Sequence, residues 1–293
     1  MRVARPASRP ANSASDAAPV ACGGRYGARV NGWHIPRPRR DWALFLDVDG
    51  TLLEFVDDPE AVRTDAALVR CLAALGDALG GALALVSGRS LAQLSRVFGG
   101  YELPAAGLHG LERRSAAGVE RLPVELPAHV RGALAALAAR HPGLRVEDKG
   151  ASVAVHWREA PALEPVATVT LRELAAALGP AWQLQPGACV LELKPALRTK
   201  ADAVREFLAE PPFAGRRPVY VGDDLTDLDG FAAVEGRGGE AIAVGDRVQA
   251  RWRLPDPAAV REWLAHVQAA LAAAAPPSRV SAREAGAAAG ARE

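Results

Sequence analysis

Cysteine is scarce in this 293-residue chain, and the three that are present, Cys22, Cys71 and Cys189, lie far apart. No two of them form the CxxC pair that commonly holds zinc, and three widely spaced thiols do not make a disulfide framework. Such cysteine usage is typical of proteins from a reducing compartment. We therefore expect a cytoplasmic protein.

Long apolar runs are also missing. No uninterrupted stretch approaches the length of about 20 residues that a helix needs to cross a bilayer, so no membrane association is expected. Acids are nearly missing from residues 1–40, which hold eight Arg and a single Asp, a net charge of +7. Since the whole chain carries +1, the remainder carries −6, and a nucleic-acid partner is not expected.

The basic leader is rich in Pro, Ala, Ser and Gly and has no apolar core of the kind found in secretory signals. A segment of this composition buries too little apolar surface to offset the entropy of ordering. We therefore expect residues 1–40 to be disordered.

Short apolar runs alternate with amphipathic segments in two parts of the chain. The runs at 42–48, 82–87, 219–224 and 241–245 predict buried parallel strands, and the segments between them have helical spacing. This alternation predicts an α/β fold, with a doubly wound Rossmann-like parallel sheet. Ligands of such sheets bind at the carboxyl ends of the strands.

The middle of the chain has a different pattern: a helix, two strands, a second helix and a hairpin. We interpret residues 112–193 as a smaller α+β cap inserted between two halves of a catalytic core, 41–111 and 194–271. Beyond the closing amphipathic helix, residues 272–293 are expected to be a disordered tail.

Asp47 and Asp49 follow the first predicted strand in the string DVDGT. Residues two apart in extended chain lean to the same side, so the two carboxylates repel each other unless a cation lies between them or one is protonated. An oxygen-preferring ion such as Mg²⁺ would relieve the repulsion. Ser87 and Asp223 also follow predicted strands, so the three strand ends should meet at one edge of the sheet.

Four ordered features resemble the motifs of the haloacid dehalogenase superfamily of phosphotransferases: DVDGT at 47–51, SGR at 87–89, Lys200, and GDDLTD at 222–227. The resemblance implies that Asp47 attacks phosphorus and forms an aspartyl-phosphate. It also implies that Asp49 protonates the departing sugar oxygen and then deprotonates the hydrolytic water.

The same resemblance supplies the remaining roles. Lys200 would hold the nucleophile and the phosphate, while Ser87, with Gly88 and Arg89, would bind the phosphate. Mg²⁺ would be held by Asp47, the carbonyl oxygen of Asp49, and Asp223 with either Asp224 or Asp227 behind it. Thr51 would orient Asp49 or support the turn.

Each motif alone has a simpler explanation. DxDG also occurs in turns and calcium loops, SGR arises by chance, and a lysine that opens a helix is usually solvated. An acidic helix N-terminus would explain Asp224 and Asp227. The order of the motifs, each after a strand, favours the catalytic interpretation.

Strings within and beside the expected cap resemble trehalose-6-phosphate phosphatases in particular: GLHG at 107–110, VEDKGASVAVHWR at 146–158 and LELKP at 191–195. The resemblance spans about residues 41–265. It implies that Glu147, Lys149 and Glu192 bind the glucose unit remote from the phosphate. A cross-strand salt-bridge set would also explain these three residues. His109 is expected to reach substrate from the hinge, although a structural histidine fits equally well.

The resemblance implies a Mg²⁺-dependent hydrolase that converts trehalose 6-phosphate to trehalose and phosphate, the last step of trehalose biosynthesis. A functional link to a trehalose-phosphate synthase is possible. Two alternatives stay open. One is a related phosphatase of sucrose phosphate, mannosylglycerate phosphate or a monosaccharide phosphate. The other is a non-catalytic regulatory module of a trehalose-synthesising complex.

Overall fold

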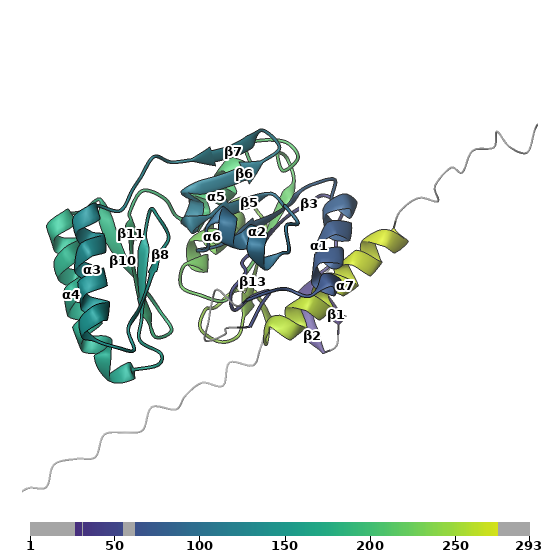
Figure 1. Ribbon diagram of the computed structural model, residues 1–293. Coiled ribbons are helices and arrows are strands. Elements are labelled where there is room, and N and C mark those ends of the chain that lie inside the picture. The colour runs from purple at the N-terminus through teal and green to yellow at the C-terminus, as the bar shows by residue number, and fades with distance from the viewer. Residues whose placement is uncertain (1–26, 31, 55–61, 275–293) are drawn as a thin grey trace, which may run out of the picture.

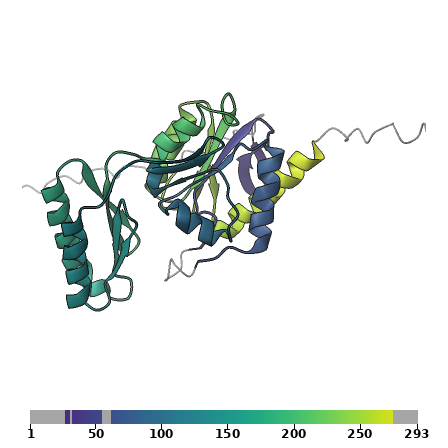
Figure 2. The ribbon, with the colours of Figure 1, turned by 45° about the horizontal axis from the view of Figure 1, so that its top comes forward.

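The computed structural model describes residues 27–30, 32–54 and 62–274. These residues form two lobes side by side (Figures 1 and 2). The larger lobe is built on an eight-stranded sheet and the smaller on a four-stranded sheet. Most of the predicted leader (1–26) and tail (275–293) lies outside the described residues. No helix in the described ranges is long and apolar enough to cross a membrane.

The strands of the large sheet follow the order β14-β13-β12-β3-β4-β5-β6-β7. Neighbours from β14 to β5 pair in parallel, whereas β6 and β7 are antiparallel. The predicted doubly wound parallel sheet is confirmed. The bounds are β3 Trp42–Leu46, β4 Leu83–Val86, β5 Ala105–Gly107, β6 Glu112–Ser115, β7 Gly118–Arg121, β12 Arg217–Gly222, β13 Glu240–Val244 and β14 Trp252–Leu254.

Helices cover both faces of this sheet, which is why all five residues of β3 are buried. Leu44 and Leu46 belong to the hydrophobic cluster on one face, and Ala43 and Phe45 to the cluster on the other. The first cluster takes in α1 Ala66–Ala78, α2 Leu91–Val97 and α7 Pro257–Ala273, and the second takes in α5 Lys200–Phe207 and α6 Asp227–Glu235.

We call the larger lobe the core and the smaller lobe, residues 128–195, the cap. The antiparallel sheet of the cap has the order β10-β11-β9-β8. Both cap helices lie on the side of this sheet that faces away from the core, so its other face is turned toward the core (Figures 1 and 2). The bounds are α3 Ala128–Arg140, β8 Arg145–Asp148, β9 Val153–His156, α4 Glu164–Leu178, β10 Trp182–Gly187 and β11 Val190–Pro195.

The last part of the leader is ordered. β1 Gly27–Val30 and β2 Trp33–Pro36 form an antiparallel hairpin. Ile35 is fully buried, and the His34 ring lies 5.0 Å from that of Trp252 in β14. At residues 27–30 and 32–40 the structure therefore differs from the disorder expected up to residue 40, while residue 31 and residues 1–26 lie outside the described part of the chain. The average composition of the leader, rich in Pro, Gly and Arg, did not indicate that the short segment around Ile35 packs on the core.

The hairpin of β6 and β7 also differs from expectation. We assigned residues from 112 onward to the inserted unit, but β6 pairs with β5 and so extends the core sheet. The cap elements begin only at Ala128. Local sequence does not reveal which sheet a hairpin joins, because that depends on pairing with a distant strand.

Candidate active site

Three predicted site residues follow strands of the core sheet. Asp47 comes directly after β3, Ser87 after β4, and Asp223 after β12. All three are buried. Since these strands are parallel neighbours, their carboxyl ends lie at one edge, and the structure brings the three side chains together there.

Lys200 is the first residue of α5, and its side chain is buried at the same edge. Its Nζ atom lies 2.8 Å from Oδ1 of Asp47 and 2.7 Å from Oδ1 of Asp227. Burial alone would lower the pKa of Lys200, but the carboxylates of Asp227 and Asp47 reverse this and raise it above its ordinary value. Lys200 therefore stays charged.

Carboxylate oxygens of Asp47, Asp223 and Asp227 all lie within 4.8 Å of one another. Burial and the charge of Asp227 raise the pKa of Asp47, and they raise that of Asp223 to about 6. One lysine does not balance three ionised carboxylates, so the group could hold a further cation. Carboxylate oxygens are the ligands that Mg²⁺ prefers, so the residues present fit such an ion.

Within this group, Asp227 is occupied by donors from the protein. Its Oδ1 accepts from Lys200 Nζ (2.7 Å) and from the Tyr220 hydroxyl (2.8 Å). Its Oδ2 accepts from the backbone N–H groups of Asp223 (3.1 Å) and Asp224 (3.0 Å). A carboxylate offers about four lone-pair positions. Asp227 is thus placed to hold the loop and the lysine in position.

Asp224 lies apart from the carboxylate group. Its Oδ1 is 2.9 Å from a guanidinium nitrogen of Arg247. Of the two acids that the sequence left open as support for the metal, the structure places Asp227 beside Asp47 and Asp223, and Asp224 toward the cleft. Asp224 as a metal ligand stays a prediction.

Asp49 is held by the SGR loop. The Arg89 guanidinium donates to both of its oxygens, from Nε at 2.7 Å and from a terminal nitrogen at 2.6 Å. Gly50 has φ +83°, a conformation that favours glycine and lets the chain turn sharply here. The Thr51 hydroxyl donates to Asp223 (3.0 Å) and Asp47 (3.4 Å), so its predicted support of the turn takes the form of contacts with the carboxylate group, not with Asp49.

Two of the three predicted sugar-binding residues, Glu147 and Glu192, lie on the cap sheet, and Lys149 directly follows β8. Glu147 on β8 and Glu192 on β11 both pair in register with Ala154 on β9, so they share one face with a small residue between them. Lys149 Nζ lies 3.2 Å from Glu192, whose other oxygen accepts from Ser152 (2.6 Å). The structure therefore brings the three together, close to the core.

In this cap group, Lys149 and hydrogen-bond donors stabilise the ionised form of both glutamates. Burial raises the pKa of Glu192, but Lys149 and hydrogen bonds outweigh it, so the pKa lies well below its usual range. For Glu147, hydrogen bonds from His156 and Gln93, together with the charge of Lys149, outweigh burial and lower the pKa to about 2. Both glutamates are ionised acceptors at neutral pH.

His109 lies between the SGR loop and the cap. Its Nε2 is 3.7 Å from Glu192 Oε2, and burial lowers its pKa to about 4, so the ring is neutral near pH 7. A Cβ atom on Gly88 would meet His109 Nε2 at 2.9 Å. Only glycine at position 88 leaves room for the ring, which packs against the predicted phosphate loop.

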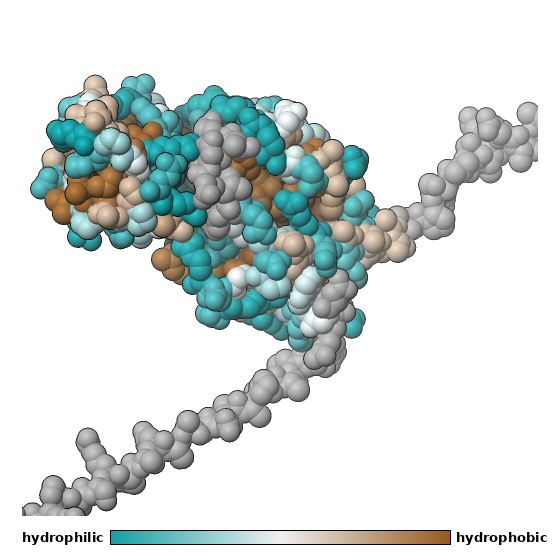
Figure 3. Space-filling model, turned by 60° about the horizontal axis from the view of Figure 1, so that its bottom comes forward, coloured by the Kyte–Doolittle hydropathy of each residue, from teal (hydrophilic) through white to brown (hydrophobic). Residues whose placement is uncertain are grey.

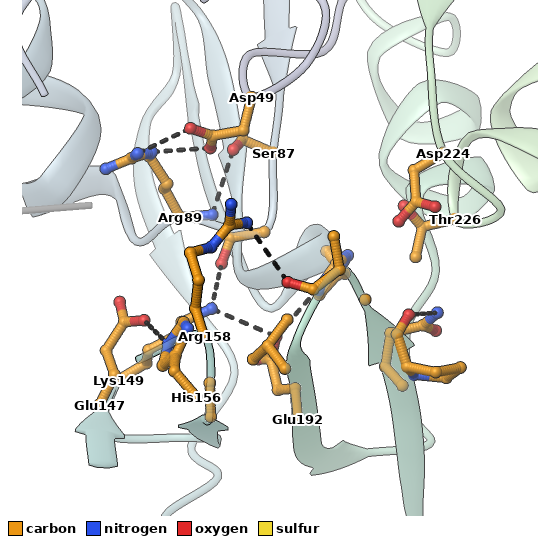
Figure 4. A pocket seen from close by; sticks show the side chains of 18 of the residues that line it. Asp49, Ser87, Arg89, Glu147, Lys149, His156, Arg158, Glu192, Asp224 and Thr226 are labelled. Carbon is orange, nitrogen blue, oxygen red and sulfur yellow. Dashed lines mark hydrogen bonds and ion pairs between the residues drawn. The ribbon is translucent and has the colours of Figure 1, made fainter. Parts of the chain in front are cut away.

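One cavity of about 440 Å³ joins the two groups. Figure 4 shows Asp49, Ser87 and Arg89 on its core side facing Glu147, Lys149 and Glu192 on its cap side. Its volume is within the range of small-molecule sites, roughly 300–1,000 Å³. Figure 3 shows that polar side chains also cover much of one outer face of the molecule, with apolar patches between them. Of the other predicted residues, Asp47, Gly88, His109, Lys200 and Asp224 line the same cavity, whereas Asp223 does not.

Sequence reasoning missed several residues around this cavity. Arg145, Arg158 and Arg247 add positive charge to its wall. Gln93 on α2 contacts Glu147 across the cleft. Of these, only Gln93 had a local signal, since Ser90-Leu-Ala-Gln93 has the spacing of a helix capping box.

The fold is similar to that of solved phosphatases. The C-terminal domain of a Candida albicans trehalose-6-phosphate phosphatase is 22% identical with a TM-score of 0.67, over 78% of this chain and 92% of that chain. A phosphatase of the haloalkanoate (HAD) superfamily from Bacteroides thetaiotaomicron is 17% identical with a TM-score of 0.51, over 80% and 97%. The fold is therefore the one found in phosphatases with a haloacid dehalogenase-like core.

Sequence comparison narrows this class. A trehalose-phosphatase family model matches residues 45–255. Trehalose-6-phosphate phosphatase of Escherichia coli is 39% identical over 80% of this chain and 90% of its own length. A probable trehalose-phosphate phosphatase of Sinorhizobium fredii is 42% identical over 72% and 80%. The chain belongs to the trehalose-phosphatase family, as its motifs predicted.

Proposed function

We propose that this protein hydrolyses trehalose 6-phosphate to trehalose and inorganic phosphate through a phosphorylated Asp47. The observation that carries the proposal is a cavity that has the buried Asp47–Lys200 pair of the core at one end and the polar Lys149–Glu192 pair of the cap at the other. Phosphate would bind at the core end and the distal glucose at the cap end.

The first step is the attack of an Asp47 carboxylate oxygen on phosphorus, with cleavage of the bond between phosphorus and the sugar oxygen. Lys200 holds Asp47 at 2.8 Å and supplies positive charge to the phosphate. Ser87 is placed to donate to a phosphate oxygen. Asp47, Asp223 and the Asp49 carbonyl would hold Mg²⁺, which when bound offsets the negative charge of carboxylates and phosphate.

Asp49 carries the proton in both steps. It donates to the departing sugar oxygen, then accepts a proton from the water that attacks phosphorus and frees Asp47. In the structure both of its oxygens accept from Arg89, so Arg89 has to release one of them before Asp49 carries a proton. Binding of phosphate gives Arg89 another anionic partner for this exchange.

The experiment is phosphate release by the purified chain with Mg²⁺, measured on trehalose 6-phosphate, sucrose 6-phosphate and glucose 6-phosphate. Trehalose 6-phosphate should have the highest kcat/KM. Equal kcat/KM for all three would contradict the substrate, and no release from any of them would favour the regulatory alternative. Quenching with hydroxylamine should convert the acyl phosphate into a hydroxamate at Asp47, detectable by mass spectrometry. An Asp47→Asn variant is the control.

We also propose that the enzyme works in the cytoplasm, which the family membership and the cysteine usage support. A functional link to a trehalose-phosphate synthase stays a prediction.

A further inference from the structure

Each predicted sugar-binding residue of the cap faces a group of the core. Gln93 Nε2 lies 2.7 Å from Glu147 Oε1, Lys149 Nζ lies 3.4 Å from the Gly88 carbonyl oxygen, and His109 lies 3.7 Å from Glu192. The first is the shortest of the three. It joins α2 of the core to β8 of the cap.

Gln93 is fixed on the core side by the start of its own helix. The Ser90 N–H donates to Gln93 Oε1 (2.9 Å), and the Gln93 N–H donates to Ser90 Oγ (3.2 Å), which completes a capping box. Because Oε1 accepts from a backbone N–H, the NH₂ group is the end that points to the cap. The side chain is buried, so few other orientations are open to it.

Glu147 is held from two sides. Gln93 donates to Oε1, and His156 Nε2 lies 3.0 Å from Oε2. These contacts set the plane of the carboxylate and leave lone pairs for sugar hydroxyls. An oriented acceptor discriminates among hydroxyl arrangements better than a mobile one, because a mismatched sugar then leaves it unpaired.

The helix of Gln93 begins directly after the predicted phosphate loop at 87–89. Gln93 thus connects the phosphate end of the cavity to its sugar end through one turn of helix. We propose that Gln93 is a positioning residue that fastens Glu147 to the phosphate loop and so sets the preference for a two-ring sugar phosphate. The proposal rests on the proposed function, since it assumes that the cap reads the sugar.

The test separates this role from simple helix capping. Glu completes a capping box as well as Gln, so Gln93→Glu keeps the start of α2. It also places a carboxylate oxygen against that of Glu147. We expect kcat/KM for trehalose 6-phosphate to fall about tenfold or more, the effect of losing a hydrogen bond to a charged group, while that for p-nitrophenyl phosphate changes less than about twofold. Gln268→Glu on α7 is the matched control and should leave both values unchanged.

A second measurement needs no substrate. Hydrogen exchange of β8 amides in the free protein should speed up in Gln93→Glu and return toward the parent rate in Gln93→Glu with Glu147→Gln. In the double variant an amide at 147 again donates across the cleft and still accepts from His156. This arm decides whether Gln93 fastens the cap even if trehalose 6-phosphate proves not to be the substrate.

Equal losses on both phosphate esters would overturn the proposal, because Gln93 would then act only through the phosphate loop. The proposal would also be overturned if Gln93→Glu left kcat/KM for trehalose 6-phosphate unchanged, or if the β8 amides exchanged at the same rate in Gln93→Glu as in the parent protein. Failure of the parent protein on trehalose 6-phosphate, with β8 exchange and rescue as expected, would instead refute the proposed substrate.

Discussion

The two charged groups that face each other across the cavity are built in opposite ways. In the core, Asp47, Asp223 and Asp227 crowd around one lysine, and the pKa values of Asp47 and Asp223 are raised. In the cap, the acids are matched by Lys149, a histidine and hydroxyl or amide donors, and the pKa values of Glu147 and Glu192 are lowered.

The difference matches the parts of the substrate that each group would meet. A phosphoryl group brings negative charge. The core group already has excess negative charge, so it needs a cation before it can bind a phosphoryl group. A neutral sugar brings hydroxyls, which bind to ionised groups that other side chains already hold in a fixed orientation. On the proposed function, the same residue types would serve phosphoryl transfer in one lobe and sugar recognition in the other.

The largest expected effect comes from the core. Asp47→Asn keeps the size of the side chain but removes the nucleophile, so kcat should fall by more than about 10³-fold, as when other covalent nucleophiles are removed. Phosphate release in excess Mg²⁺ measures it, with circular dichroism to show that the fold is kept. Asp77→Asn, an exposed acid on α1, is the control. Turnover of the Asp47→Asn variant at the parent rate would contradict the mechanism.

In the cap, Lys149→Met leaves Glu192 without its cation. Breaking a buried pair on one side costs about 3 kcal/mol of stability, which urea unfolding should detect. The KM for trehalose 6-phosphate should rise, while kcat/KM for p-nitrophenyl phosphate stays within about threefold. A similar loss on both substrates would mean that the cap group does not read the sugar. Arg172→Met on the outer cap helix is the control.

Metal addition should stabilise the core only. At a Mg²⁺ concentration of 100 times Kd, binding to the folded state adds about 2.7 kcal/mol to the free energy of unfolding. Thermal unfolding with Mg²⁺ or with chelator measures this. Asp223→Asn should reduce the shift strongly, whereas Glu192→Gln should keep it. A shift that survives Asp223→Asn would place the ion elsewhere.

The smallest effect concerns His109, at the boundary of the two groups. Burial lowers its folded pKa from 6.5 to about 4, so the unfolded state binds more protons between these values. The contribution of neutral His109 to the free energy of unfolding is therefore complete above pH 6.5 and is lost as the pH drops toward 4. The loss at pH 5 should be about 2 kcal/mol, and His109→Gln should remove it. Urea unfolding at pH 5 and at a pH above 6.5 tests this, with His266→Gln as the control variant.

Sequence alone predicted the parts of the site that depend on local chemistry. Asp47, Ser87 and Asp223 stand at strand ends, where polar residues after an apolar run are conspicuous, and the parallel sheet then brings them together. The sequence could not predict which side chains from distant segments contact each other. Arg89 meets Asp49 from 40 residues away, and the spacing of Asp224 and Asp227 does not say which of them turns inward.

The hairpin of β1 and β2 has a practical consequence. It packs beside β14, and α7 ends at the same end of the molecule, opposite the cap (Figure 1). Affinity tags or fused domains attached before Gly27 or after Ala274 therefore join the protein on the side remote from the cleft. A shortened version of the protein should retain residues 27–40, because cutting at Asp41 would expose Trp252 and the edge of the sheet.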